Sequence, residues 1–295
     1  MKKFIALLLF MFLINIQAQV TANRFIYELS FKPKKDSAKL DKVMSVLDIV
    51  KEKSLFRDYT LIEQDSILNA KVEAMKKSGV YKDLSKEIRM PKFSYKIEKF
   101  YPGMEIRYTE GMLNGNTPVD LAYRETPKFN WKISNEKAKI GEYNVQKATT
   151  DFAGRSWTAW FSSDIPLQDG PYKFYGLPGL IVKVEDTAKD YSWELKGNRQ
   201  VPNFDELTMM EKMSPMRSGK VVEVPRAKFE KTFSDYKKDP FSSFRSQMTP
   251  EAMAQKIPGQ DKTLGEMFKE QEKRIKDFYN NNDNPIEKTI PADKK

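Results

Sequence analysis

An apolar run from Phe4 to Ile14 follows a short basic start at the beginning of the chain. A run of about 11 apolar residues is typical of a secretory signal peptide and is too short to span a bilayer, which takes about 20. Small Ala18 precedes the expected cleavage point. We therefore expect residues 1–18 to be a signal peptide, and the mature chain to be periplasmic, or secreted, with no transmembrane segment.

Between residues 19 and 200 the hydrophobic pattern is mainly that of β-strands. Phe25, Tyr27, Leu29 and Phe31 alternate with other residues, which places them on one face of a strand. Similar runs predict further strands at 46–49, 54–56, 93–100, 104–108, 121–123, 130–133, 143–150, 157–162, 180–185 and 191–195. Short strands joined by tight turns predict a β-rich antiparallel domain over residues 19–200. Its sheet should be curved, like the half barrel of lipoprotein carriers.

Helical patterns are confined to one early segment and to the end of the chain. A polar helix is expected at 65–78, where Gly79 stops it. The spacing of apolar residues predicts further helices at 226–237, 250–255 and 263–279, after a brief strand at 220–224. We expect residues 201–285 to form a helical segment packed on the sheet, and residues 286–295 to form a disordered tail. The expected fold class is α+β.

The composition removes most familiar catalytic chemistry, because the 295-residue sequence contains no Cys and no His. Without these residues there is no Ser-His-Asp triad, no thiolate nucleophile, no disulfide and no metal site built on imidazole or thiolate. Catalysis would have to use carboxylates, Lys, Tyr or a Ser–Lys pair. We therefore expect a non-enzymatic protein without a cofactor, with a His-free hydrolase as an alternative.

The chain is basic, with 51 Lys and Arg against 41 Asp and Glu and a formal net charge of +10. The positive residues are spread along the sequence and are not gathered into one block. Spread charge is typical of a solvated surface. An exported protein also does not meet nucleic acid, so we expect no nucleic-acid partner.

The run from residue 170 to residue 181 carries a recognisable motif, Gly-Pro-Tyr-Lys-Phe-Tyr-Gly-Leu-Pro-Gly-Leu-Ile. It resembles the GLPGLI family of exported bacterial proteins, and ordered flanking elements extend the resemblance over residues 131–185. Members often carry Cys where Val145 stands, so a thiol-dependent role would not transfer. Members are also often linked with TonB-dependent outer-membrane uptake systems. The resemblance therefore implies an accessory role in the periplasm, with such a transporter as partner.

The motif has a structural and a functional interpretation. Residues 177–180 fit a type II turn, because Pro178 fixes φ and Gly179 supplies a positive φ, while Gly176 would allow a close backbone approach. This turn explains each residue as part of a rigid bend before a strand. In the functional interpretation the loop gates a cavity or docks a partner. The candidate residues for ligand or partner binding are Trp157, Trp160, Tyr172, Phe174, Gly176, Leu177, Pro178 and Gly179.

The aromatic residues near the motif also allow two interpretations. Trp157 and Phe161 should lie on one face of a strand and Trp160 on the other. They would form a sheet core, or they would line a concave cavity for a lipid or a peptide. We hypothesise an exported accessory or binding protein, which holds a hydrophobic or peptide ligand or docks an outer-membrane uptake component.

A Met-x-x-Met-x-x-Met spacing at Met210, Met213 and Met216 is a candidate metal site. Thioethers are soft ligands that select Cu(I). However, Pro215 would interrupt a helix here, and Met is also an adaptable filler of apolar gaps. Cu(I) handling is therefore an alternative function.

Overall fold

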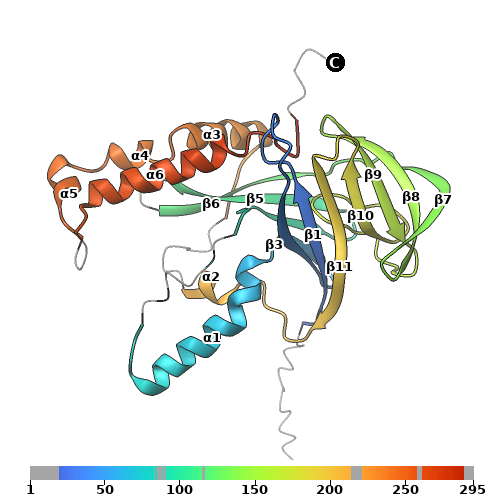
Figure 1. Cartoon of the computed structure of the whole chain (residues 1–295), viewed down its shortest axis with the longest axis horizontal. Coiled ribbons are helices and arrows are strands. Elements are labelled where there is room, and N and C mark those ends of the chain that lie inside the picture. Colours follow the sequence, from blue (N-terminus) through green and yellow to red (C-terminus); the bar gives the residue numbers. More distant parts are fainter. Residues whose placement is uncertain are drawn as a thin grey trace, which may run out of the picture.

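The structure is a computed structural model of the chain, and it describes residues 20–82, 84, 89, 91–114, 117–213, 221–257 and 261–288. Figure 1 shows one large bent sheet, with several helices grouped at one end and a separate helix, α1 (Thr60–Ser78), below it. The predicted signal peptide, residues 1–18, lies outside the described residues and stays a prediction.

In the part of the chain that the structure describes, twelve strands form the sheet. They are β1 (Ala22–Phe31), β2 (Asp41–Ile49), β3 (Lys53–Asp58), β4 (Lys96–Phe100), β5 (Glu105–Asn114), β6 (Thr117–Glu125), β7 (Lys132–Ile140), β8 (Tyr143–Phe152), β9 (Arg155–Ser162), β10 (Leu180–Asp186), β11 (Tyr191–Val201) and β12 (Val221–Glu223). The helices are α1 (Thr60–Ser78), α2 (Met209–Met213), α3 (Arg226–Lys238), α4 (Ser242–Arg245), α5 (Pro250–Ala254) and α6 (Leu264–Asn280).

The strand order is β12-β6-β5-β4-β3-β2-β1-β11-β10-β9-β8-β7. Neighbouring strands are antiparallel, except that the short β12 pairs with β6 in parallel. The two end strands, β12 and β7, do not pair with each other in the described part of the chain, so the sheet is open. The predicted α+β fold with a curved, mainly antiparallel sheet is confirmed.

Strand β1 lies at the centre of the sheet, between β2 and β11. Its alternating residues Phe25, Tyr27, Leu29 and Phe31 are buried and belong to the main hydrophobic core. We call the face that carries this core the inner face. Arg24 projects to the opposite face, which we call the outer face, because successive side chains of a strand point to opposite sides.

Several elements extend beyond the sequence prediction, and β7 and α1 show two different reasons for it. Strand β7 continues to Ile140, well beyond the predicted 130–133, and most of its residues are exposed. It is an edge strand, and its Lys-rich sequence lacks the alternation by which strands are recognised. Helix α1 begins at Thr60, whose N–H donates to the Asp58 carboxylate at 2.8 Å. It ends at Gly79, as predicted, with a left-handed φ of 67°.

Helices α3, α4, α5 and α6 form a helical lobe that meets the sheet mainly through α3. The Phe229 ring of α3 lies 5.7 Å from that of Tyr108 and 4.8 Å from that of Tyr123, both on the inner face. The apolar stripe of α6 packs within the lobe, where the Phe268 and Phe244 rings lie 3.8 Å apart. A capping box at Thr263 starts α6, as its sequence favours.

Residues 284–288 follow α6 along one end of the sheet. Ile286 is buried in the main core, and the Lys288 N–H donates to the Ala153 carbonyl at 2.9 Å. The predicted tail at 286–295 therefore begins too early, and residues 289–295 lie outside the described part of the chain. Among the residues described, no helix combines the length and the apolar character needed to cross a membrane.

Candidate functional site

The loop between β9 and β10, residues 163–179, folds onto the inner face of the sheet. Tyr172 and Phe174 of this loop are buried. The Phe174 ring lies 4.8 Å from that of Trp157, and the Tyr172 ring stacks on that of Trp193 at 5.8 Å. These aromatic contacts show that the loop fills the concave inner face with its own side chains.

A buried lysine on β4 holds this loop. The Lys99 Nζ lies 2.5 Å from the Asp169 carboxylate and donates to the carbonyls of Gly170, Tyr172 and Phe174 at 2.6, 3.1 and 3.3 Å. Burial lowers the pKa of Lys99, and the nearby Asp169 carboxylate opposes that effect. Because the ammonium shares its three protons among four acceptors, Lys99 fixes the path of the loop.

Lys173 makes a second set of buried contacts that hold the loop in place. Its Nζ donates to the Tyr123 hydroxyl at 2.7 Å and forms ion pairs with Glu287, at 2.5 Å, and with Glu125. Arg226, at the start of α3, pairs with the same two carboxylates. One network of opposite charges therefore joins the loop to β6, α3 and the segment after α6.

The turn predicted for the motif differs from the one observed. A type II turn would join the Leu180 N–H to the Leu177 carbonyl, but Leu180 donates to Ile165, and the Gly179 N–H donates to Leu177 at 2.8 Å. Gly179 has a φ of 153°, and a Cβ there would lie 2.1 Å from the carbonyl oxygen of Ser162. The close approach is thus made at Gly179, in the tight contact between this bend and the end of β9.

Gly176 does not make the predicted close approach. A Cβ at Gly176 would meet nothing within 4 Å, and its φ of 90° is the feature that favours glycine there. Both glycines therefore have a backbone reason to be present. Turn chemistry accounts for them without a ligand, although the type of turn was predicted wrongly.

The structure separates the candidate binding residues predicted from the sequence. Four of them are buried in the main core: Trp157, Tyr172, Phe174 and Leu177. Gly179 is buried as well, whereas Gly176 and Pro178 are exposed. Trp160 lies on the outer face, with the Lys147 ammonium 5.7 Å from its ring centroid, so the predicted opposite orientation of Trp157 and Trp160 is confirmed. These residues do not form one accessible surface.

The Cu(I) alternative depends on atoms that the structure does not describe. Met216 and the side chains of Met210 and Met213 lie outside the described part of the chain. Within that part, no group of three or more Asp or Glu side chains is arranged to hold a metal ion. Cu(I) handling therefore stays a prediction.

A pocket lies on the outer face, between α1, β1, β11 and the segment 204–212. Its volume is about 500 Å³, within the range of about 300–1,000 Å³ that is usual for small-molecule sites. Its charged lining residues are Arg24, Arg57, Arg199, Lys212, Glu63, Asp65 and Asp205. Its larger apolar lining residues are Ile62, Val201, Phe204 and Leu207. The pocket can therefore accept a ligand with both polar and apolar parts.

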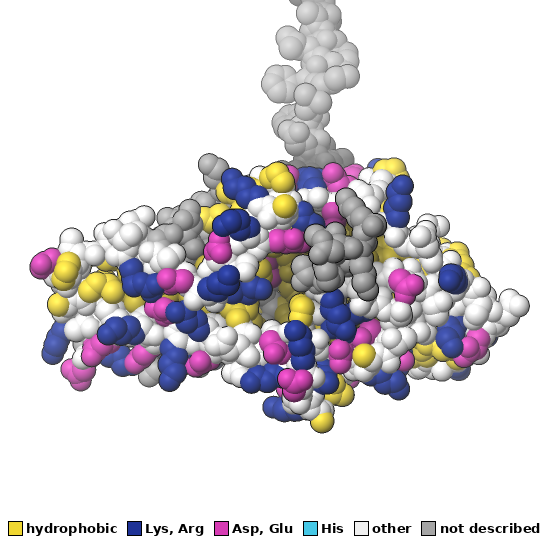
Figure 2. Space-filling view, turned by 90° about the horizontal axis from the view of Figure 1, so that it is seen from above, with side chains coloured by type: hydrophobic (Ala, Val, Ile, Leu, Met, Phe, Trp, Pro, Cys, Tyr) yellow, Lys and Arg dark blue, Asp and Glu magenta, His cyan; other side chains and the backbone are white. Residues whose placement is uncertain are grey.

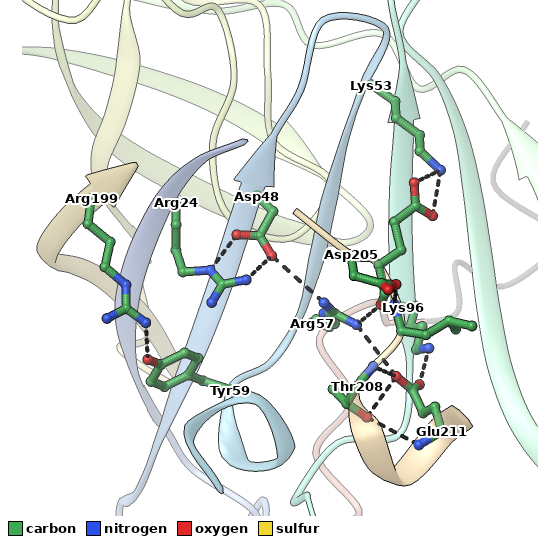
Figure 3. A network of polar contacts seen from close by, with 12 residues as sticks. Arg24, Asp48, Lys53, Arg57, Tyr59, Lys96, Arg199, Asp205, Thr208 and Glu211 are labelled. Atoms are coloured by element: carbon green, nitrogen blue, oxygen red, sulfur yellow. Dashed lines mark hydrogen bonds and ion pairs between the residues drawn. The ribbon is translucent and has the colours of Figure 1, made fainter. Parts of the chain in front are cut away.

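Charged side chains lie in a row across four neighbouring strands beneath this pocket (Figure 3). Arg24 donates from Nε and Nη2 to the Asp48 carboxylate at 2.6 and 3.0 Å. The Arg57 guanidinium lies 3.8 Å from the same carboxylate and 3.7 Å from that of Glu211. Burial lowers the pKa of Arg57, and these carboxylates oppose the effect. The two buried arginines are thus balanced by carboxylates beneath the pocket.

Arg199 differs from these two arginines in having no such partner. Its guanidinium donates to the Tyr59 hydroxyl at 3.2 Å, and no described carboxylate lies within ion-pairing distance of it. Arg199 also stands directly opposite Arg24 in the pairing of β1 with β11. Like charges at directly opposed positions on neighbouring strands repel. Among the residues described, the guanidinium of Arg199 therefore has no carboxylate to balance its charge.

Acidic side chains line the pocket as well, and two of the three have cationic partners. Asp205 pairs with Lys212 at 2.5 Å, which lowers the pKa of Asp205. Glu63 pairs with Arg89 at 2.8 Å. Asp65 accepts one backbone N–H at 2.9 Å, and burial raises its pKa. The pocket is thus mixed in charge and not uniformly basic.

Sequence reasoning missed this site for reasons that lie in the topology. Arg199 is beyond the predicted end of its strand at residue 195. A register shift between Ile26 and Tyr27 decides which residue of β11 faces Arg24. The available indication was Asp48, a carboxylate inside the apolar run 46–49, since Asp is rarely buried unless it is paired.

The molecular surface is also mixed in charge. Figure 2 shows Lys and Arg side chains interspersed with Asp and Glu over the face seen from above. Ion pairs such as Arg124 with Glu223, at 2.9 Å, and Arg107 with Glu98, at 2.5 Å, follow the same pattern on the outer face. On the face shown, the basic excess is therefore not gathered into one patch.

Comparisons with known proteins match the motif region to a family model and find similar solved structures. The model of a family described as "Protein of unknown function (Porph_ging)" matches residues 153–183, which contain the loop and its motif. Crystal structures of PNGF-II in space groups P21 and C2 are similar to the chain, with 16% identity and a TM-score of 0.49. They cover 74% of this chain, which spans 34% and 33% of theirs, about a third of their length. No curated protein sequence matches the chain.

Proposed function

We propose that the chain is an exported, non-enzymatic binding protein of the GLPGLI type, which holds a small ligand in the pocket on the outer face. Export is supported by the apolar run before residue 19 and by the resemblance over residues 131–185. The same resemblance supports an accessory role beside an outer-membrane uptake component. The binding proposal rests on one observation: the pocket is open, whereas the inner face is filled by the loop 163–179.

The groups around the pocket suit binding better than catalysis. A general acid or base must be free to exchange a proton with the reacting group. Asp205 and Glu63 are instead held in ion pairs, and Asp65 accepts a backbone N–H. Arginine stays protonated and serves to hold and orient a ligand. These features favour a binding protein over the His-free hydrolase.

Under this proposal the motif has a structural task. The loop fills the inner face, and Lys99 and Lys173 tie it to β4 and β6. A ligand could reach the buried Tyr172 and Phe174 only if these ties were broken. The motif would therefore maintain the bent sheet on whose outer face the pocket lies.

A tryptophan placed in the pocket tests the proposal. Ser66 lines the pocket on α1, while its neighbour Ile67 is 59% exposed and is not one of the lining residues. Native mass spectrometry of the mature protein, produced by export into a periplasm, should detect a bound small molecule in the wild type and in Ile67→Trp. Ser66→Trp should lack it while melting at the same temperature. A wild type without a bound mass, or equal retention by Ser66→Trp, would contradict the proposal.

A further inference from the structure

We infer that the ligand of this pocket carries a carboxylate, held by Arg24, Arg199 and the Tyr59 hydroxyl, on an otherwise apolar body. The inference rests on the proposed function, because it names the chemical class of ligand for the same pocket. It is supported by the charge balance of the pocket, by the free donors that face it and by its apolar lining.

Among the residues described, Arg199 is the pocket arginine that has no carboxylate within ion-pairing distance. Asp48 accepts hydrogen bonds from Arg24 with both oxygens and also lies near Arg57, which is close to Glu211 as well. Arg199 has no ion pair with a carboxylate of the described residues and donates a hydrogen bond to the Tyr59 hydroxyl. Since Arg199 stands opposite Arg24, the two guanidinium groups repel each other. A negative group bound beside both would remove that repulsion.

The free donors come from three different elements. Arg24 donates to Asp48 from Nε and Nη2. Its Nη1 has no hydrogen-bond partner among the described residues and is not one of the buried unpaired atoms, so it can face the pocket. Arg199 uses Nη2 on Tyr59 and keeps its other donors. The Tyr59 oxygen accepts that bond, which leaves its own proton available. Figure 3 shows these three side chains on the same side of the sheet. Guanidinium groups match the planar geometry of a carboxylate.

The surrounding groups select a singly charged ligand with an apolar part. A carboxylate carries a single negative charge, which the guanidinium of Arg199 can pair with. A phosphate dianion would meet repulsion from the nearby Glu63, Asp65 and Asp205. The apolar body would lie against a wall made by Ile62, Val201, Phe204 and Leu207. The pocket therefore fits an amphipathic carboxylate better than an inorganic anion or a neutral lipid.

Three compounds represent these ligand classes: octanoate the amphipathic carboxylate, octan-1-ol the neutral lipid and inorganic phosphate the inorganic anion. Isothermal titration calorimetry measures the binding of each. Octanoate should bind at least about tenfold more tightly than octan-1-ol, since a charge-assisted hydrogen bond has at least that effect on affinity. Phosphate should bind more weakly than octanoate. Arg199→Gln should weaken octanoate binding about tenfold and leave octan-1-ol unchanged. The control is Lys196→Gln, on the same strand but outside the pocket, and it should bind as the wild type does.

Equal affinity for octanoate and octan-1-ol would overturn the inference, as would an Arg199→Gln variant that binds octanoate normally. Octanoate that fails to bind at millimolar concentration would overturn it too. The two proposals fail in different ways. A neutral molecule lost from Ser66→Trp would preserve the binding function and exclude the carboxylate. A bound mass that Ser66→Trp retains would exclude the pocket itself.

Discussion

Replacing Lys99 by Met removes the cation that binds three carbonyls and one carboxylate of the loop 163–179. The substitution keeps an unbranched apolar stem but takes away the ion pair with Asp169 and the hydrogen bonds to three loop carbonyls. Asp169 would keep hydrogen bonds from the Tyr101 hydroxyl and the Gly170 N–H. Its carboxylate would then be buried without a cation, so we expect a large loss of stability.

The size of that loss follows from the burial of the pair. Removing one partner of a buried ion pair costs about 3–5 kcal/mol. Burial of Lys99 is itself unfavourable in the wild type, as its lowered pKa indicates, which places the expected cost near the lower end, at about 3 kcal/mol. For a chain of this size the melting temperature falls by about 2–4 °C per kcal/mol, so the decrease should be about 6–12 °C.

Thermal unfolding followed by circular dichroism measures this decrease. The matched control is Lys196→Met, which removes an exposed pair with Glu194 whose side chains are 42% and 34% accessible. Such a pair contributes at most about 1 kcal/mol, so the control should melt within about 4 °C of the wild type. A Lys99→Met protein that melts no lower than this control would refute the role given to Lys99.

Three further outcomes follow from the structure. Gly179→Ala should lower the free energy of unfolding, measured in urea, by about 1–3 kcal/mol, because its Cβ would meet the Ser162 carbonyl oxygen at 2.1 Å. Burial raises the pKa of Glu110 to about 7 from 4.5, so the folded state holds a proton that the unfolded state has released. The contribution of Glu110 to the free energy of unfolding is fully present below pH 4.5 and is lost as the pH rises through 7. The decrease should be about 3 kcal/mol, and Glu110→Gln should abolish it. Arg155→Met should speed hydrogen exchange at 284–288, because oxygens of residues 284, 285 and 286 accept hydrogen bonds from that guanidinium.

Each of these outcomes has its own control. Gly176→Ala adds a methyl group where nothing lies within 4 Å, so it should cost less than Gly179→Ala, and the opposite order would contradict the close approach at Gly179. A Glu110→Gln protein with the same pH dependence as the wild type would exclude Glu110 as the titrating group. Unchanged exchange at 284–288 in Arg155→Met would mean that other contacts hold this segment.

The strands could be predicted because their pattern is local. Phe25, Tyr27, Leu29 and Phe31 share one buried face, and their spacing alone reveals it. Gly79 marks the end of α1 for an equally local reason, since its backbone is left-handed. The edge strand β7 was predicted too short because one-sided burial, the cause of the alternating pattern, is absent there.

The functional geometry depends on contacts between residues far apart in the chain. Lys99 occupies an inward position of β4, yet only the folded loop provides its partner Asp169. Arg24 and Arg199 become neighbours through the pairing of the first and eleventh strands, after a register shift. No local pattern specifies that register. The motif was found from the sequence, which left open whether its aromatic residues pack in the core or line a cavity. The structure places Tyr172 and Phe174 in the core.

Hydrogen–deuterium exchange of the mature protein, with and without octanoate, tests most directly the claim that the motif loop is structural and that the ligand binds on the outer face. The backbone N–H groups of Phe174, Gly176, Leu180 and Ile181 are hydrogen-bonded within the loop or to the residues that flank it. We predict slow exchange at 174–181 that octanoate does not change, together with slower exchange at 60–69 of α1 when octanoate is bound. Rapid exchange of the loop, or octanoate protection of the loop and not of α1, would contradict the account.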